Sequence, residues 1–396
     1  MIGKPQFTML VLATVTVTAV ATPMISVVYD PTKPYMVDKR RNIQHTAPNA
    51  ELEIVACIYD EKNVGGISKV LEISNPTVMS PFSVHALHLT ELVGRAAALF
   101  MDHDTEEDGL SNISQSNIHN ALKHLHKGKE GAIKMHYYTS VSPKKSMYQD
   151  ICEVALSKKA SLIILPYHKD QTDSSTRTDV VKESVESINS NVLKHAPCSV
   201  AILVQKSSFL NIFQGRQNYS LYKFVVLFLG GPDSREALTY ASRMADNLDV
   251  SLTVIRFFSN DNQGDNIIEK KLDDGIVTRF WVKNEGNTRV TYKEVVLCNG
   301  EETVEAIQAM NKDHYDLWIV GRKQGINPVL LHGLTRWYHN YELGAVGDFV
   351  ASSDLDSAGS VLVIQQQILR GQDLAARKFL HRYTFSKTSS VASHYE

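Results

Sequence analysis

The sequence has few cysteines and no cysteine motif. Only four cysteines occur among 396 residues, and no two of them form a C-x-x-C pair. Structural zinc sites and disulfide frameworks need closely spaced or numerous cysteines, so the sequence argues against both. Because each cysteine lies inside or beside an apolar run, we expect buried free thiols, as in a reducing compartment, at Cys57, Cys152, Cys198 and Cys298.

Known catalytic motifs are missing as well. There is no G-x-S-x-G nucleophile elbow, no H-E-x-x-H zinc motif and no Walker phosphate loop. His85 and His88 lie on a predicted strand, where residues three apart face opposite sides, so they are badly placed to share a metal ion. We therefore predict no catalytic residue, no metal site, no resident cofactor and no enzymatic activity.

Neither sign of charge dominates the sequence. The 41 Lys and Arg residues nearly balance the 43 Asp and Glu residues, which gives a net charge of −2. Nucleic-acid-binding domains concentrate positive charge, so we expect no nucleic-acid partner. Charged residues make up 21% of the chain and hydrophobic residues 43%, which is typical of a folded globular protein and not of a disordered one.

Charge is entirely absent from residues 5–29. Read as a helix with a rise of about 1.5 Å per residue, this segment is long enough for a hydrocarbon core of about 30 Å. The charges that follow are mainly basic, so the positive-inside rule places the chain after residue 30 in the cytoplasm. We predict a membrane helix. The alternatives are a signal peptide, with an A-x-A cleavage pattern at residues 19–21, and a buried core helix.

The rest of the sequence contains the same order of elements twice. The halves begin with apolar strands at 52–60 and 222–231 and end with strands at 198–206 and 359–367. Strands alternate with helical segments in between, which predicts parallel sheets with right-handed crossovers. The expected fold class is α/β: an N-terminal membrane helix followed by two tandem doubly wound parallel-sheet domains. Two such five-stranded units resemble the universal-stress-protein-like fold.

This pattern predicts six segments along the chain. They are a membrane helix in 1–30, a basic linker in 31–50, a first α/β domain in 51–206, a linker in 207–220, a second α/β domain in 221–370 and a disordered tail in 371–396.

A nucleotide site is one interpretation of the loops that follow the strands. Ligands of α/β proteins bind beyond the carboxyl ends of strands, where glycines let backbone N–H groups approach a phosphate. The candidate residues are Asp60, Asp233, Gly321, Gly325 and Gly333. Their spacing departs from the G-x2-G-x9-G-[S/T] pattern of nucleotide-binding stress proteins, and Leu334 stands where a hydroxyl is required. The sequence therefore favours the other interpretation, turn glycines and solvated carboxylates.

Several segments, in order along nearly the whole chain, resemble the plant cation/H⁺ exchangers, the CHX group of the monovalent cation:proton antiporters. These segments include "TPMISVVYDPTKPY" (22–35), "HALHLTELVGRAAALFMDH" (85–103), "APCSVAILV" (196–204), "GGPDSREALTYASRMA" (230–245) and "GLTRWYHNYELGAVGDFVASSD" (333–354). The resemblance implies a membrane antiporter that exchanges K⁺ or a similar cation for H⁺ and has a cytosolic regulatory half.

The resemblance also implies an ion site made of paired carboxylates inside the membrane. The predicted membrane helix contains none, so no ion-site residue can be assigned. We expect a truncated or partial family member that consists of the last membrane helix and the cytosolic region. We expect it in an endomembrane or the plasma membrane, with a role in cation and pH homeostasis. A homodimer is a further expectation. It should not transport alone. The alternatives are a nucleotide-binding stress-protein-like module and a hydrolase-type enzyme without a recognisable nucleophile–base pair.

Overall fold

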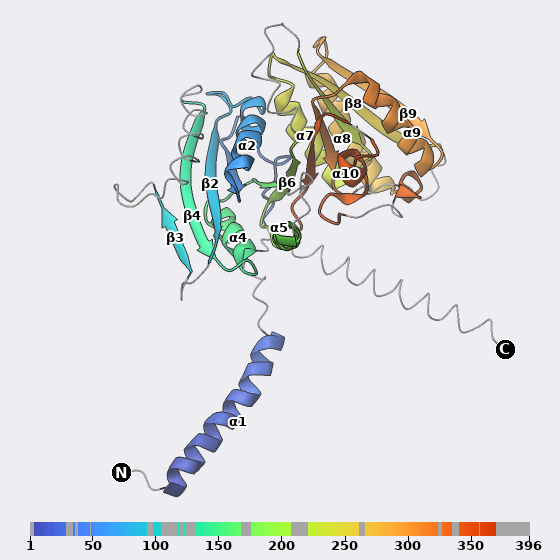
Figure 1. Cartoon of the computed structure of the whole chain (residues 1–396). Helices are drawn as coiled ribbons and strands as arrows, with labels where there is room; N and C mark the ends of the chain where they lie inside the picture. Colours follow the sequence, from blue (N-terminus) through green and yellow to red (C-terminus); the bar gives the residue numbers. More distant parts are fainter. Residues whose placement is uncertain are drawn as a thin grey trace, which may run out of the picture.

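The computed structural model describes residues 4–28, 35, 39–47, 49–92, 98–103, 118, 122, 131–167, 176–206, 221–260, 266–323, 327–334, 340–355 and 357–369. It consists of a long N-terminal helix and a body in which helices cover a twisted sheet (Figure 1). The predicted linker 207–220 and the predicted disordered tail 371–396 lie outside the described residues.

Helix α1 (Lys4–Val28) carries mostly exposed apolar side chains. The hydroxyls of Thr14, Thr16 and Thr18 donate hydrogen bonds to backbone carbonyls four residues earlier, so the helix itself satisfies these polar groups. In the part of the chain that the structure describes, no helix combines the length and the apolar character that crossing a membrane requires. The membrane helix stays a prediction.

The described residues of the first half form six strands. They are β1 (Leu52–Ile58), β2 (Phe82–Glu91), β3 (Leu99–Asp102), β4 (Ile133–Ser142), β5 (Leu162–Pro166) and β6 (Ser199–Val204). The described helices of this half are α2 (Glu61–Ile73), α4 (Met147–Ser157) and α5 (Thr176–His195). Strands β4, β2, β1, β5 and β6 are neighbours in that order and run parallel, while β3 pairs antiparallel with β4 at the edge.

The second half repeats this topology. Its strands are β7 (Tyr222–Phe228), β8 (Val250–Ser259), β9 (Val290–Leu297), β10 (Leu317–Gly321) and β11 (Ser360–Gln365). Its helices are α7 (Pro232–Met244), α8 (Ile267–Lys283), α9 (Gly300–Met310) and α10 (Gly344–Ala351), with 3₁₀ turns η1 (Asn311–Asp313) and η2 (Pro328–Leu331). The strand order β9-β8-β7-β10-β11 matches that of the first half, and all pairs within it are parallel. The doubly wound α/β fold and the repeat are confirmed.

The two halves share one sheet of 11 strands (Figure 1). The last strand of each half pairs antiparallel with the other, so that Val204 lies opposite Val361 and Val200 opposite Gln365. We call this β6–β11 pair the seam. Adjacent strand residues such as Ile54 and Val55 enter different apolar clusters because they face opposite sides of the sheet, and each cluster continues through both halves. The two halves therefore share a core on each face.

Some local predictions were wrong. Cys298 is exposed, unlike the other three cysteines, because it lies in the turn after the open edge strand β9. Helix α7 begins at Pro232 after Gly231, so Ser234 lies inside the helix. Strand β3 and helix α8 were not anticipated.

Candidate functional site

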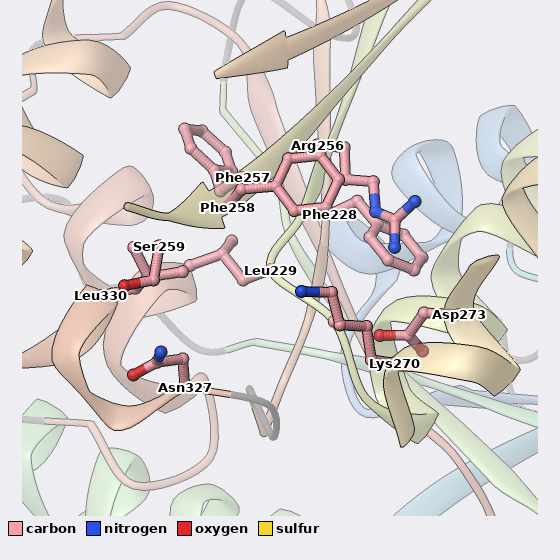
Figure 2. Close-up of a pocket in the computed structure, with 11 residues that line it drawn as sticks. Phe228, Leu229, Arg256, Phe257, Phe258, Ser259, Lys270, Asp273, Asn327 and Leu330 are labelled. Carbon is pink, nitrogen blue, oxygen red and sulfur yellow. The ribbon is translucent and has the colours of Figure 1, made fainter. Parts of the chain in front are cut away.

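A hollow lies at the carboxyl ends of β7 and β8 (Figure 2). The ends of these strands, the first turns of α8, and Asn327 and Leu330 after β10 form its walls. Its volume is about 320 Å³ when the space open to solvent is included. Parallel α/β sheets bind ligands in this position, so we take the hollow as the candidate site.

Arg256 supplies a fixed positive charge to this wall. Its side chain is only 7% exposed, and the guanidinium carbon lies 4.5 Å from the ring centre of Phe258 and 5.7 Å from that of Phe228. Such cation–π contacts hold the guanidinium in place, and an ion pair with Asp274 adds to them. The hollow therefore has a positioned cation and aromatic surface side by side.

A buried ion pair fixes α8 beneath the hollow. Asp273 is fully buried, and its Oδ1 lies 2.6 Å from Nη1 of Arg235 on α7. The backbone N–H of Gly231 donates to the same carboxylate, at 3.0 Å from Oδ2, and Glu269 is a second partner of Arg235. Burial raises the pKa of Asp273, while these donors oppose the rise. The pair locks α8 to the first turn of α7.

A lysine and a serine add polar groups to the wall of the hollow. Figure 2 shows the Lys270 side chain between Leu229 and Asp273, so a second cation reaches the site. The hydroxyl of Ser259, also in the wall, is buried without a hydrogen-bond partner. The described residues that form the wall include no histidine or cysteine. The wall thus places Arg256, Lys270 and an unpartnered hydroxyl beside the buried carboxylate of Asp273.

The described residues among those predicted for a nucleotide site do not line this hollow. Asp60 is exposed at the start of α2 in the first half and makes no capping hydrogen bond. Asp233 is buried, and its carboxylate accepts the backbone N–H groups of Lys323 (2.8 Å) and Gln366 (2.9 Å). It thereby ties α7 to the ends of β10 and β11. The role of Asp60 and Asp233 at a nucleotide stays a prediction.

The described glycines of the predicted nucleotide site lie in different backbone environments. Gly321 ends β10 against the first turn of α7, with Ser234 N only 2.6 Å from where a Cβ would lie. Gly333 has a φ of +103° in open space, as in a turn. Gly325 lies outside the described residues. Sequence reasoning missed Arg256, although a single charge inside the apolar run "VSLTVIRFFS" was a usable signal.

Adding a methyl group at Gly321 should test the close contact between β10 and α7. In Gly321→Ala the new Cβ meets backbone atoms of Ser234 and Asp233, so we expect a loss of about 1–3 kcal/mol in the free energy of unfolding. Gly275→Ala is the control, because Gly275 lies inside α8 with open space around it and should gain about 0.5–1 kcal/mol. Urea denaturation followed by tryptophan fluorescence measures both. Equal effects would contradict the contact.

Asp233 should make stability depend on mild acidification. Burial raises its pKa to about 6, above the ordinary value of 3.8, so its favourable contribution is complete at low pH and is lost as pH rises through 6. Between pH 7.5 and pH 5 the wild type should gain about 1.4 kcal/mol more stability than Asp233→Asn. Glu236 and Asp273 also have raised pKa values, but they are present in both proteins, so the comparison isolates Asp233. Parallel pH profiles of the two proteins would refute the prediction.

Both halves of the sheet match domains of one family. Residues 84–208 match the plant cation/H⁺ antiporter domain, and residues 221–365 match the C-terminal domain of plant cation/H⁺ antiporters. Among solved structures, a universal stress protein from Archaeoglobus fulgidus is similar at 13% identity and a TM-score of 0.41, covering 80% of this chain and 96% of that one. Because this TM-score is low, the fold is defined by the strand order described above and not by the similarity to this structure.

Curated relatives extend the match along the chain. Cation/H⁺ antiporter 24 of Arabidopsis thaliana is 46% identical over 395 residues, which cover 93% of this chain and 46% of that protein. Cation/H⁺ antiporter 25 of the same plant is 43% identical over 420 residues, covering 100% of this chain and 48% of that protein. The chain thus spans about half the length of the curated relatives it matches. Both halves match domains of the same family, and these two relatives align with at least nine-tenths of the chain. The chain therefore belongs to the plant cation/H⁺ antiporter family and carries its C-terminal domain.

Proposed function

We propose that this chain forms the cytosolic regulatory region of an antiporter that exchanges a monovalent cation, K⁺ in our proposal, for H⁺. The observation that supports it most is the 46% identity to a cation/H⁺ antiporter through both halves of the sheet. Ion and proton pathways through membranes use carboxylates inside the bilayer, and segment 5–29 contains no acidic residue. A body whose two halves share a core suits control of transport better than transport itself.

We also propose that α1 anchors the body to an endomembrane or the plasma membrane, with the body in the cytoplasm. The support is its 25-residue length, its exposed apolar side chains and the basic residues that follow. Alkaline carbonate extraction of membranes from cells that produce the full chain tests the anchor. We expect the chain to stay in the pellet, and release into the supernatant would refute the anchor.

A growth assay tests whether the chain transports. Cells that lack K⁺ uptake should not be rescued when they produce this chain alone, because the chain brings no acidic residue into the membrane in segment 5–29. The comparison is the same cells producing full-length antiporter 24 of Arabidopsis. Clear rescue by this chain would overturn the proposal that it is a regulatory region.

Regulation needs its own assay. We would replace the matching region of antiporter 24 with this chain and compare cation/H⁺ exchange by the chimaera with exchange by antiporter 24 cut before that region. We expect the chimaera and the shortened protein to differ in rate or in pH dependence. Identical rates and identical pH profiles would refute a regulatory role.

A second candidate function is the binding of a nucleotide or another small anion. The hollow supports it, because Arg256, Lys270 and the unpartnered Ser259 hydroxyl meet at the carboxyl ends of parallel strands. Equilibrium dialysis of the full chain with ATP and with AMP tests it, with Arg256→Ala as the variant and the exposed Lys293→Ala on β9 as the control. Binding that is absent at millimolar ligand, or unchanged in Arg256→Ala, would remove this candidate.

A further inference from the structure

Residues 39–46 dock against the body, although they lie in the predicted basic linker. Asn42 is 4% exposed and Ile43 1% exposed, and Ile43 belongs to the apolar cluster on one face of the sheet. The side chain of Arg41 donates to the carbonyl of Leu156 at the end of α4. We call residues 39–46 the strap. The described residues between α1 and β1 are 35, 39–47 and 49–51, so the strap makes up most of them.

One carboxylate joins the strap to both halves. Glu236 on α7 is fully buried, and its Oε1 accepts the backbone N–H of Ile43 (2.6 Å) and the hydroxyl of Ser199 (2.7 Å). Its Oε2 accepts the backbone N–H of Gln44 at 3.2 Å. Ser199 begins β6 in the first half, whereas α7 belongs to the second half. Neutral donors from the strap and from β6 thus satisfy a buried carboxylate on α7, which would be costly without them.

Two glutamines after β11 bind the strap beside this carboxylate. The side chain of Gln367 accepts the backbone N–H of Arg41 (2.5 Å) and donates to the carbonyls of Lys39 (3.0 Å) and Pro197 (2.8 Å). The side chain of Gln366 donates to the Oε1 of Gln44 at 2.8 Å. Because Pro197 lies just before β6, Gln367 also spans the two halves.

The seam places these partners. The backbone N–H of Gln367 donates to the Ser199 hydroxyl (3.2 Å), and the backbone N–H of Lys206 donates to the Ser360 hydroxyl (3.0 Å) on the other side of the pair. Ser199 and Gln367 are therefore held next to Glu236 by the antiparallel pairing itself. If β6 and β11 separated, Glu236 and Gln367 would stay with the second half, and Ser199, Pro197 and Leu156 would leave with the first.

We propose that the strap is a conformational coupler: it docks when the seam is closed and is released when the seam opens, so that the state of the body reaches the chain that leads to α1. The docking does not depend on the proposed function, while its effect on transport does. Neither half alone carries all the partners, so the strap reports the pairing of the halves and not the folding of one of them.

Trypsin tests the docking directly, because it cleaves after Lys39, Arg40 and Arg41. In the full chain in detergent we expect slow formation of new N-termini at residues 40–42, read by mass spectrometry. Glu236→Ala should accelerate this cleavage at least tenfold, and the exposed Glu305→Ala on α9 should leave it unchanged. Ile43→Ala, which alters only the strap, should have the same effect as Glu236→Ala and decides the matter if Glu236→Ala fails to fold. Unchanged cleavage in Ile43→Ala would overturn the docking.

Hydrogen exchange tests the coupling. We expect the backbone amides of Ile43 and Gln44 to exchange with the same protection as the amide of Gln367, because one opening exposes all three. Strap amides that exchange more than tenfold faster than Gln367 in the wild type would overturn the coupling. In the chimaera described above, Ile43→Ala should change transport. If Ile43→Ala released the strap and left transport unchanged, the proposed link to α1 would be refuted, while the claim that the strap docks would stand. The experiment therefore separates the two claims.

Discussion

Asp273→Ala should lower the free energy of unfolding by about 3–5 kcal/mol, because removing one partner of a buried ion pair leaves the other charge unpaired. Arg235 is 5% exposed and loses its contact at 2.6 Å, and the Gly231 N–H loses its carboxylate acceptor. Glu269 can compensate only in part, since its own side chain is 28% exposed. Urea denaturation of the full chain in mild detergent measures the loss.

The neighbouring residue provides a matched control. Asp274 carries the same group, but its side chain is 53% exposed and its buried partner Arg256 keeps its contacts with the rings of Phe228 and Phe258, so Asp274→Ala should cost only about 1 kcal/mol. A loss in Asp273→Ala no larger than that in Asp274→Ala would show that the Arg235–Asp273 pair does not fix α8. Asp273→Ala should also weaken any anion binding in the hollow, because it loosens α8, and α8 carries Lys270.

Trp318→Ala should have an effect of similar size for a different reason. Trp318 on β10 is fully buried, and its indole N–H donates to the hydroxyl of Ser357 at 2.9 Å. Alanine would leave a large cavity and remove one hydrogen bond of the Ser357 hydroxyl, which keeps the backbone N–H of Gly359, and the loss should be about 3–5 kcal/mol. The midpoint and slope of a urea transition followed by far-UV circular dichroism give the loss.

Trp281→Ala is the control for this substitution. Trp281 on α8 is 53% exposed, so the same change of side chain should cost well under 1 kcal/mol. If the two variants unfolded at the same urea concentration, the central position of β10 in a shared core would be wrong.

The strands could be predicted because their residues are apolar on both sides. The runs in β1, β7 and β10 are buried almost without interruption, and such runs are typical of a parallel sheet covered on both faces. Helix α8 could not be predicted in this way. Some of its apolar residues face the core, but Ile268, Leu272 and Val282 face solvent. The 3.6-residue period of apolar side chains is therefore lost.

The site and the seam depend on contacts that no local pattern encodes. Glu236 has the sequence context of a surface residue on a helix, and its burial follows only from the strap and the antiparallel pairing of strands in different halves. Asp233 was identified as a residue of interest from its place after β7, whereas its acceptance of two backbone amides required the ends of β10 and β11. The repeat is visible in sequence, but the way in which its two copies pair is not.

The long separation along the chain between the strap and its partners has a consequence during protein synthesis. The hydrogen bond between Arg41 and Gln367 cannot form until Gln367 is synthesised, 326 residues after Arg41. At typical ribosome speeds of about 5–20 residues per second, this delay lasts roughly 16 to 65 seconds. Throughout that time the strap lacks its hydrogen bonds to Gln367, so nascent chains should carry an incompletely docked strap that a chaperone can hold, and a ribosome stalled before Gln367 would leave it in that state.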